Sequence, residues 1–387
     1  MRLLCAHYRT GEPVAVEIEE AGGGWRARRV AGRPTDPAEY ILAPVLVDIQ
    51  VNGHSGVYFA VTESISEEGV AKVTADISHF GVGFYLPTVI TGSFETIHHC
   101  LTVIARSRRQ GDLARRVPAI HLEGPYISAE DGPRGAHPKE HARPPSWDEF
   151  ARWQEAAEGL IRYVTLAPEL PGAVDFIKRL RREGILPAIG HTAASPDDIR
   201  AAVDAGAVLS THLGNGSHAL IRRHPNYIWE QLATDELWAS LIPDGHHLPP
   251  SVLKVMIRAK GIERTVLTTD ASALAGMPPG LYEFSNRKVE VVPGGPVRLV
   301  GTEYLAGSAL EMNEAVANTV RFAGVSLAAA FEMASLHPAY LLRTYGNTDI
   351  RPFDDGTFGV YRWRDERLEV VATVVDGDVK GGSVVRP

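Results

Sequence analysis

The stretch VPAIHLEGPYIS, residues 117–128, joins an apolar, strand-like run to polar residues and a break in the chain. The apolar residues 117–120 are followed by His121 and Glu123, after which Gly124 and Pro125 end the run. Glycine and proline together are strong signals that a strand stops. An acidic side chain at such a strand end is either simply solvated or held there for chemistry, and the rest of the chain decides between the two.

Eight apolar runs of this kind recur, and stretches with helical spacing of apolar residues separate them. The runs cover residues 44–51, 83–90, 117–123, 161–167, 185–191, 207–213, 237–243 and 265–270. The helical stretches cover residues 67–80, 95–109, 146–159, 171–183, 196–205 and 249–260. Ser195 before Pro196 predicts a capped helix start. Alternating strands and helices predict an α/β fold, and eight strands favour a TIM-like (β/α)8 barrel, although an open doubly wound sheet has the same pattern.

The two ends of the chain differ from this pattern. Residues 1–43 and 353–387 contain short alternating segments separated by Gly and Asp turns, which is typical of antiparallel, half-exposed strands. We expect a small β-sandwich built from both termini, with the barrel, residues 44–352, inserted between them. A Gly/Pro-rich excursion at 274–307 also contains alternating pieces and predicts a hairpin over the mouth of the barrel.

Composition narrows the class of function. The 387 residues are 44% hydrophobic and 22% charged, as in ordinary globular proteins. A net charge of −8 without a long Lys/Arg block argues against a nucleic-acid or membrane partner and favours a small-molecule substrate. Cys5 and Cys100 are too few for a disulfide framework. With an N-terminus too poor in apolar residues for a signal peptide, we expect a cytoplasmic protein.

Polar residues stand where most of the eight runs end. In a parallel barrel the loops after the strands converge on one face, so this is where an active site is expected. The residues are Gln50, Asn52, Glu123, His191, His212, Asn215, Asp244, His247 and Asp270.

Three of these residues form a candidate metal site. A single histidine at a strand end is usually structural, but Glu123, His191 and His212 come from three different strands. One carboxylate and two imidazoles match a catalytic zinc site that keeps a position open for water, and iron or manganese would accept the same ligands. Asp270 suits a general base, because a metal lowers the pKa of bound water to about 7 and a nearby carboxylate can then take its proton. Its alternative role is a helix cap or a support for the ligands.

The chain resembles the N-acetylglucosamine-6-phosphate deacetylases of the amidohydrolase superfamily. The motifs that carry the resemblance span the whole barrel in the order and spacing of that family. They are HLEGPYIS (121–128), GAHP (135–138), VTLAPE (164–169), GHT (190–192), THLGN (211–215), DGHH (244–247), TTDA (268–271) and LAGSAL (305–310). The family fold is a TIM-like barrel with a small β-sandwich from both termini, in agreement with the pattern above.

The resemblance implies a set of roles. It implies that Glu123, His191 and His212 hold one divalent metal ion, expected to be zinc, with iron, manganese or cobalt as alternatives. Asp270 is then the catalytic base and acid, and His137 holds and polarises the acetyl carbonyl. Many amidohydrolases bind a second metal through a His-x-His pair at the end of strand one, where this chain has Gln50 and Asn52, so one metal is expected.

Further residues correspond to contacts with an amino sugar phosphate. Asn215, Gly216 and His247 correspond to sugar contacts. Arg223 corresponds to a phosphate contact that reaches the site of a neighbouring subunit, so a homodimer is expected. The guanidinium of Arg223 is a planar fork that suits phosphate, although an arginine in RRHP can equally be a solvated loop charge.

The chain departs from the family pattern at residues 214–218 and 227–230. Because this segment shapes the sugar-phosphate pocket and the subunit contact, the chemistry is better supported than the substrate. N-acetylglucosamine-6-phosphate is expected first, with N-acetylgalactosamine-6-phosphate or another N-acetyl sugar as the alternative. A cyclic amidohydrolase and a catalytically silent metal-binding sugar sensor are more remote alternatives.

Overall fold

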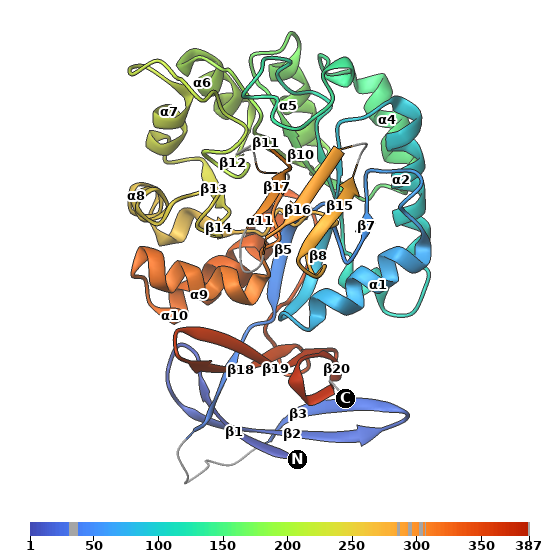
Figure 1. Cartoon of the computed structure of the whole chain (residues 1–387), viewed down its shortest axis with the longest axis vertical. Coiled ribbons are helices and arrows are strands. Elements are labelled where there is room, and N and C mark those ends of the chain that lie inside the picture. The colour runs from blue at the N-terminus through green and yellow to red at the C-terminus, as the bar shows by residue number, and fades with distance from the viewer. Residues whose placement is uncertain (31–37, 285–286, 293–295, 302–304, 306, 386–387) are drawn as a thin grey trace.

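A computed structural model describes residues 1–30, 38–284, 287–292, 296–301, 305 and 307–385. An α/β body occupies one end of the molecule, and a small β domain that contains both termini occupies the other (Figure 1).

The eight predicted strands are present and form one parallel sheet in the order β5-β8-β9-β10-β11-β12-β13-β14. Their bounds are β5 Leu46–Val51, β8 Val82–Ile90, β9 Ile120–Glu123, β10 Ile161–Leu166, β11 Leu186–Ile189, β12 Leu209–Ser210, β13 Trp238–Leu241 and β14 Thr265–Leu267. The first and last strands meet where they end, since Val51 bridges Ala271 and the N–H of Asn52 donates to the Ala271 carbonyl at 2.8 Å. The sheet is therefore a nearly closed barrel, and the predicted fold is confirmed.

The strands are apolar on both faces because both are covered. All six residues of β5 are buried. Val47 and Ile49 belong to one apolar cluster, whereas Leu46 belongs to another. Alternate side chains of a strand point to opposite faces, so the two clusters lie on the two sides of the barrel wall. This explains why the sequence reads as continuous apolar runs rather than as alternation.

Helices surround the barrel (Figure 1). Their bounds are α1 Glu67–Ser78, α2 Phe94–Ser107, α3 Leu113–Arg116, α4 Trp147–Ala156, α5 Ala173–Arg182, α6 Pro196–Ala205, α7 Tyr227–Ala233 and α8 Pro250–Lys260, with short 3₁₀ turns η1 Lys139–His141 and η2 Ile262–Arg264. All six predicted helical stretches are confirmed. At α6, the Ser195 hydroxyl accepts from the Asp198 N–H and the Asp198 carboxylate accepts from the Ser195 N–H, so the predicted cap is a complete capping box.

Four more helical segments follow, and none of the predicted stretches covers them. They are α9 Met312–Ala323, α10 Leu327–Phe331, the π-helical turn η3 Glu332–Leu336 and α11 His337–Tyr345. Leu341 and Leu342 of α11 pack in one cluster with Leu186 and Leu209, the first residues of β11 and β12. Helix α11 therefore closes the barrel at the end where its strands begin.

The small domain is built from both termini, as predicted. Its strands are β1 Arg2–His7, β2 Pro13–Ala21, β3 Gly24–Val30, β4 Tyr40–Ala43, β18 Phe358–Arg364, β19 Arg367–Val375 and β20 Asp378–Gly381, followed by the 3₁₀ turn η4 Ser383–Val385. Hydrogen bonds join the strands in one closed ring, β1-β2-β3-β20-β19-β18-β4, rather than in the two separate sheets of a sandwich. A closed ring leaves no unpaired edge strand. The domain boundaries 43/44 and 352/353 stay a prediction.

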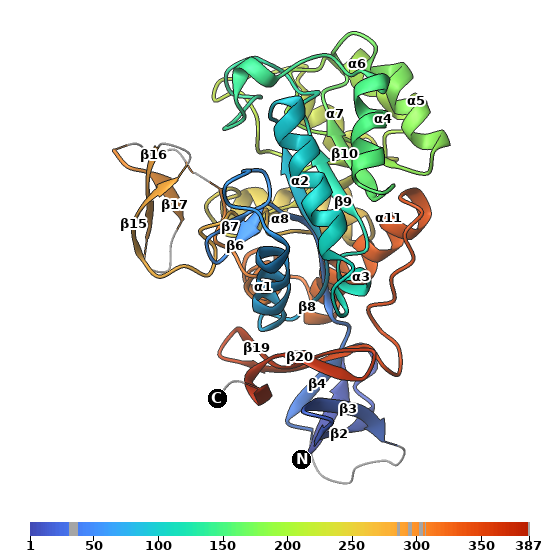
Figure 2. The same ribbon diagram turned by 90° about the vertical axis from the view of Figure 1, so that its right-hand side faces the viewer.

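The excursion at 274–307 forms a small sheet of β15 Gly280–Phe284, β16 Arg287–Val291 and β17 Val297–Leu299. In both views it lies beside the pair β6 Gly53–His54 and β7 Val57–Tyr58, which follows the end of β5 (Figures 1 and 2). The predicted hairpin is thus part of a three-stranded sheet at the mouth. Ala306 of the LAGSAL motif lies outside the described residues. Within the described ranges, no helix has the length and apolarity needed to cross a membrane.

Candidate metal centre and active site

Four of the predicted site residues lie immediately at or after the ends of barrel strands. Glu123 ends β9, and His191, His212 and Asp270 follow β11, β12 and β14 by two, two and three residues. The three following residues have φ values of 51°, 30° and 50°. Non-glycine residues rarely adopt this left-handed region, and such strain concentrates at functional sites. The turn at each strand end therefore directs a polar side chain to the barrel mouth at a cost in backbone energy.

Glu123, His191 and His212 meet in one buried cluster. The Glu123 Oε1 atom lies 2.9 Å from Nε2 of His212 and 3.3 Å from Nε2 of His191, and the two Nε2 atoms are 3.1 Å apart. The three residues are 2%, 7% and 3% exposed. The predicted ligand set is thus assembled in space, and it is a group able to hold a metal ion.

The donor set fits a divalent cation. His191 Nδ1 lies 2.8 Å from the carbonyl of Pro133. A carbonyl only accepts, so Nδ1 carries the proton and the lone pair of Nε2 faces the cluster. Bonds of about 2.0–2.1 Å to a tetrahedral zinc ion would place ligand atoms about 3.3 Å apart, close to the observed spacing. A cation would satisfy the two imidazoles and the carboxylate together.

The charge state of Glu123 also suits a ligand. Burial raises the pKa of Glu123, but hydrogen bonds with His191 and His212, together with their charge, outweigh burial and leave the pKa well below its usual value. The carboxylate is therefore ionised, as a metal ligand must be.

Asp270 lies beside this cluster and is joined to it by the first strand. The Gln50 amide nitrogen donates to Glu123 Oε1 at 2.8 Å and to Asp270 Oδ1 at 2.9 Å, and Asn52 donates to the same Oδ1 at 2.6 Å. Burial, followed by the charge of Glu123, raises the pKa of Asp270 to about 6. Gln50 and Asn52 thus orient the carboxylate of Asp270.

His137 reaches the cluster from the loop after β9. Its ring centroid lies 4.3 Å from that of His191, and its Nδ1 is 2.8 Å from the hydroxyl of Thr91. Burial, followed by the charge of His191, lowers the pKa of His137 to about 3, so the imidazole is neutral. Thr91 was not anticipated from the sequence, although it follows β8 directly and so occupies another strand end.

Two more predicted residues lie next to His191 and His212. Asn215 is tied to the His212 carbonyl through its backbone N–H at 2.9 Å and its side-chain amide at 3.1 Å. Gly216 has φ of 55°, and a Cβ there would lie 2.7 Å from His191 Nδ1. Only glycine lets the backbone approach the ligand ring this closely. Tyr227 also lines the adjacent space, which measures only about 10 Å³.

His247 faces the site from the loop after β13. Its Nδ1 lies 2.6 Å from Asp244 Oδ2, and the backbone N–H groups of His246 and His247 donate to the other carboxylate oxygen. The charge of His247 lowers the pKa of Asp270, so the two side chains share one electrostatic environment.

Arg223 is the one predicted site residue that the structure does not bring to the cluster. It is exposed, and its side chain forms no ion pair or hydrogen bond with any residue that the structure describes. Nearby Leu220 and Trp229 are 94% and 52% exposed. The segment around Arg223 therefore presents cationic and apolar groups to the outside of the molecule.

A contact that the sequence did not reveal joins this segment to the loop that carries His137. His218 Nε2 lies 3.1 Å from Glu130 Oε2, and its Nδ1 lies 3.0 Å from the hydroxyl of Tyr227. Loop 130–137, which starts at Glu130, supplies both His137 and the Pro133 carbonyl that fixes the His191 tautomer. No local pattern signals this pairing, because Glu130 and His218 are 88 residues apart.

The chain is similar in sequence to known deacetylases. The chain is 37% identical over 306 residues to the N-acetylgalactosamine-6-phosphate deacetylase of Escherichia coli O157:H7, covering 79% of each chain. It is 36% identical over 365 residues to the bovine N-acetylglucosamine-6-phosphate deacetylase, covering 91% of this chain and 86% of that one. No family model matches the chain.

Solved structures agree with this relationship. The N-acetyl-D-glucosamine-6-phosphate deacetylase of Mycobacterium smegmatis superposes with a TM-score of 0.80 at 27% identity, covering 98% of this chain and 99% of that chain. The corresponding enzyme of Thermotoga maritima superposes with a TM-score of 0.78 at 26% identity, covering 99% and 100%. The chain therefore belongs to the N-acetylglucosamine-6-phosphate deacetylase family of amidohydrolases.

Proposed function

We propose that this protein is a metal-dependent deacetylase of an N-acetylated amino sugar phosphate, with N-acetylglucosamine-6-phosphate as the first candidate substrate. The observation that carries the proposal is the buried cluster of Glu123, His191 and His212 with Asp270 beside it. Relatives over most of the chain are named for this reaction, and a variant of the Mycobacterium smegmatis enzyme was solved with N-acetyl-D-glucosamine-6-phosphate bound.

The proposed ligands are Glu123, His191 and His212, and the proposed metal is zinc, with iron, manganese or cobalt able to use the same donors. A divalent cation held there would polarise the acetamide carbonyl and acidify a water molecule. Gln50 and Asn52 are neutral amides, which supports one metal rather than two.

Asp270 is the proposed proton carrier. Gln50 and Asn52 both donate to Oδ1, and Oδ2 accepts no hydrogen bond from the residues that the structure describes. Asp270 can therefore accept a proton from the attacking water and deliver it to the nitrogen as the C–N bond breaks, giving acetate and a free amino sugar.

His137 is the proposed partner of the acetyl carbonyl. A neutral imidazole whose Nδ1 is bound to Thr91 can donate from Nε2 to an oxygen that gains negative charge. This role needs the Thr91 hydroxyl to donate to Nδ1, so that the one proton of the neutral imidazole is on Nε2.

The proposed substrate contacts are Asn215, Gly216, His247 and Arg223. Since Arg223 points away from its own cluster, we propose that it reaches the phosphate in a neighbouring subunit of a homodimer. The two cysteines are unpaired and buried, which is compatible with the proposed cytoplasmic location.

N-acetylgalactosamine-6-phosphate is the second candidate substrate. The bacterial relative that is 37% identical is named for that sugar. Tyr227 also borders the space beside His191 in the segment that departs from the family pattern.

The test is acetate release from both sugar phosphates and from unphosphorylated N-acetylglucosamine, with metal content determined on the same sample. Turnover of N-acetylglucosamine-6-phosphate well above the other two is the expected result. Preference for N-acetylgalactosamine-6-phosphate would change the proposed substrate and leave the proposed mechanism as it is. A fully metal-loaded protein that hydrolyses none of the three would contradict the proposed function.

A further inference from the structure

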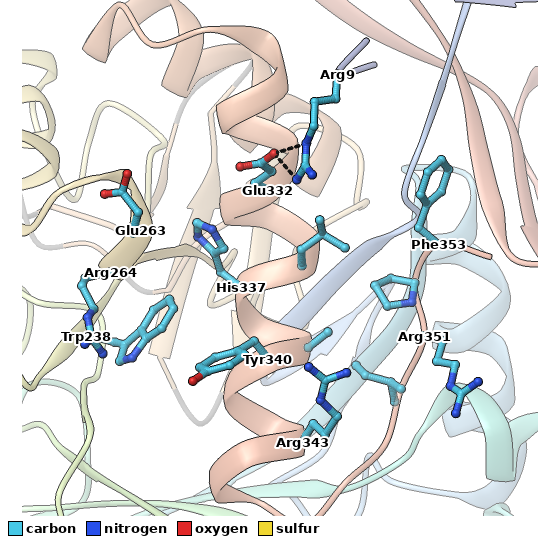
Figure 3. Close-up of a pocket in the computed structure, with 14 residues that line it drawn as sticks. Arg9, Trp238, Glu263, Arg264, Glu332, His337, Tyr340, Arg343, Arg351 and Phe353 are labelled. Atoms are coloured by element: carbon cyan, nitrogen blue, oxygen red, sulfur yellow. Dashed lines mark hydrogen bonds and ion pairs between the residues drawn. The ribbon is translucent and has the colours of Figure 1, made fainter. Parts of the chain in front are cut away.

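A second cavity lies far from the metal cluster, between the small domain and the end of the barrel where the strands begin (Figure 3). Its volume is about 660 Å³, within the range of about 300–1,000 Å³ typical of small-molecule sites. Trp238, the first residue of β13, forms part of its wall. His337, another wall residue, is bound through Nδ1 to the carbonyl of Thr265, the first residue of β14. The cavity is therefore at the opposite end of the barrel from Asp270.

The cavity is cationic although the chain is acidic. Arg9, Arg264, Arg343 and Arg351 line it, against Glu263 and Glu332. Only one of these pairs is tight: Arg9 contacts Glu332 at 2.5 Å, and the two are joined at one side of the cavity in Figure 3. On a chain with a net charge of −8, the remaining arginines form a local positive site.

Arg343 and Arg351 are available to a ligand. Arg343 makes no ion pair or side-chain hydrogen bond within the part of the chain that the structure describes, and it is exposed. Arg351 faces Asp349 at 3.5 Å with both side chains largely exposed, a pairing that contributes little. Guanidinium groups bind phosphate through two parallel hydrogen bonds, so these side chains favour a phosphorylated ligand.

An aromatic surface borders the same space. Tyr340 lies one turn before Arg343 on α11, and Figure 3 shows both projecting from this helix. Its ring is inclined 31° to that of Trp238 at a centroid distance of 5.7 Å. Arg264 lies over Trp238 at 5.3 Å, whereas Tyr340 is 41% exposed. An exposed aromatic ring beside free arginines is suited to stack a flat heterocycle.

We propose that this cavity binds a nucleoside phosphate, with the base against Tyr340 and the phosphate on Arg343 and Arg351. The cavity volume suits a small molecule, the guanidinium groups suit its phosphate, and the exposed ring suits its base. The site shares no residue with the proposed deacetylation site, so the nucleotide and the amino sugar phosphate would not compete.

The test is calorimetric titration of the metal-loaded protein with adenosine 5′-monophosphate and uridine 5′-monophosphate, with adenosine and inorganic phosphate as half-ligands. We expect one nucleotide to bind one-to-one and at least tenfold more tightly than either half-ligand. Arg343→Ala and Tyr340→Ala should each weaken binding at least tenfold. Saturating glucosamine-6-phosphate should not displace the nucleotide.

Matched controls separate this site from the active site and from general charge. Arg182→Ala removes an exposed arginine on α5, and Arg223→Ala removes the proposed phosphate contact of the active site; both should leave nucleotide affinity unchanged. Acetate release by Arg343→Ala establishes that the variant is folded. Three results would each overturn the proposal: absence of saturable binding, equal binding by Arg343→Ala, or displacement by glucosamine-6-phosphate. The cavity would then be only a solvated groove.

Discussion

The cluster of candidate metal ligands and the segment 214–230 are built in different ways. Glu123, His191 and His212 are at most 7% exposed and are positioned by the ends of strands inside a packed barrel. Arg223 and Trp229 lie on an outer segment, and their side chains are exposed. The candidate ligands are therefore held by the rigid barrel, whereas the proposed phosphate contact, Arg223, lies on an exposed segment.

The two regions are nevertheless connected. His218 contacts Glu130, so the outer segment is held against the loop that carries His137. Substitutions can therefore be ranked by their distance from the cluster, with the largest effect at the ligands and the smallest at this outer contact.

Loss of a ligand has the largest expected effect. Glu123→Ala or His191→Ala removes one of three proposed donors, so bound metal and acetate release should both fall to background. Metal content by elemental analysis and far-UV circular dichroism on the same sample check this. His246→Ala removes an exposed histidine from a loop on the same side of the barrel. It is the matched control and should keep both the bound metal and the acetate release. Full metal occupancy in the two ligand variants would remove the ligand assignment.

Asp270→Asn should retain the metal and lower kcat by roughly 10²–10⁴-fold, the usual contribution of general acid–base catalysis. Asparagine keeps the hydrogen bonds but cannot carry the proton. In the unaltered protein the base must be ionised, so kcat/KM should fall as the pH drops through the pKa of Asp270. That pKa is raised to about 6 by burial and by Glu123, and a bound cation would move it lower. Near-normal kcat in Asp270→Asn would refute this role.

Arg223→Ala should raise KM for the sugar phosphate roughly tenfold, since a hydrogen bond to a charged group is worth about 1.5–3 kcal/mol, and should leave kcat close to normal. Arg222→Ala, the exposed neighbour, is the control. With unphosphorylated N-acetylglucosamine, the Arg223→Ala and Arg222→Ala variants should have the same KM.

A mixed dimer sharpens the same prediction. If Arg223 acts in the neighbouring subunit, mixing Arg223→Ala with Asp270→Asn creates one site with both an intact base and an intact arginine. Activity with the normal low KM should then reappear in the mixture. If only the high-KM activity of the Arg223→Ala protein is measured, Arg223 acts within its own subunit or not at all.

His218→Ala should have the smallest effect. It removes a partly exposed contact with Glu130, which is worth about 1 kcal/mol, so kcat/KM should fall roughly fivefold through loosening of the loop that carries His137. His218→Gln, which can still donate to Glu130, should recover most of the loss. An unchanged kcat/KM in His218→Ala would mean that this contact does not position the loop.

Local pattern was sufficient for much of the fold and for the centre of the site. Buried parallel strands appear in sequence as short apolar runs, and the cap at Ser195 is a contact between residues three positions apart. Glu123 and the two histidines could be identified as a group because the ends of parallel strands meet on one face, whatever their separation in sequence.

Features that depend on which distant segments pair could not be obtained in this way. The terminal strands were recognised, but their pairing in one closed ring is decided by hydrogen bonds between the two ends of the chain. The link from Gln50 to both Glu123 and Asp270 likewise appears only when the first and last strands meet.

Local periodicity and the ends of strands predict the alternating strands and helices, the β domain from both termini, the candidate ligands and Asp270. The contact of His218 with Glu130 and the cavity beside Tyr340 and Arg343 follow only from the folded structure. Both features are contacts between segments far apart in the chain, which packing creates and no local pattern encodes.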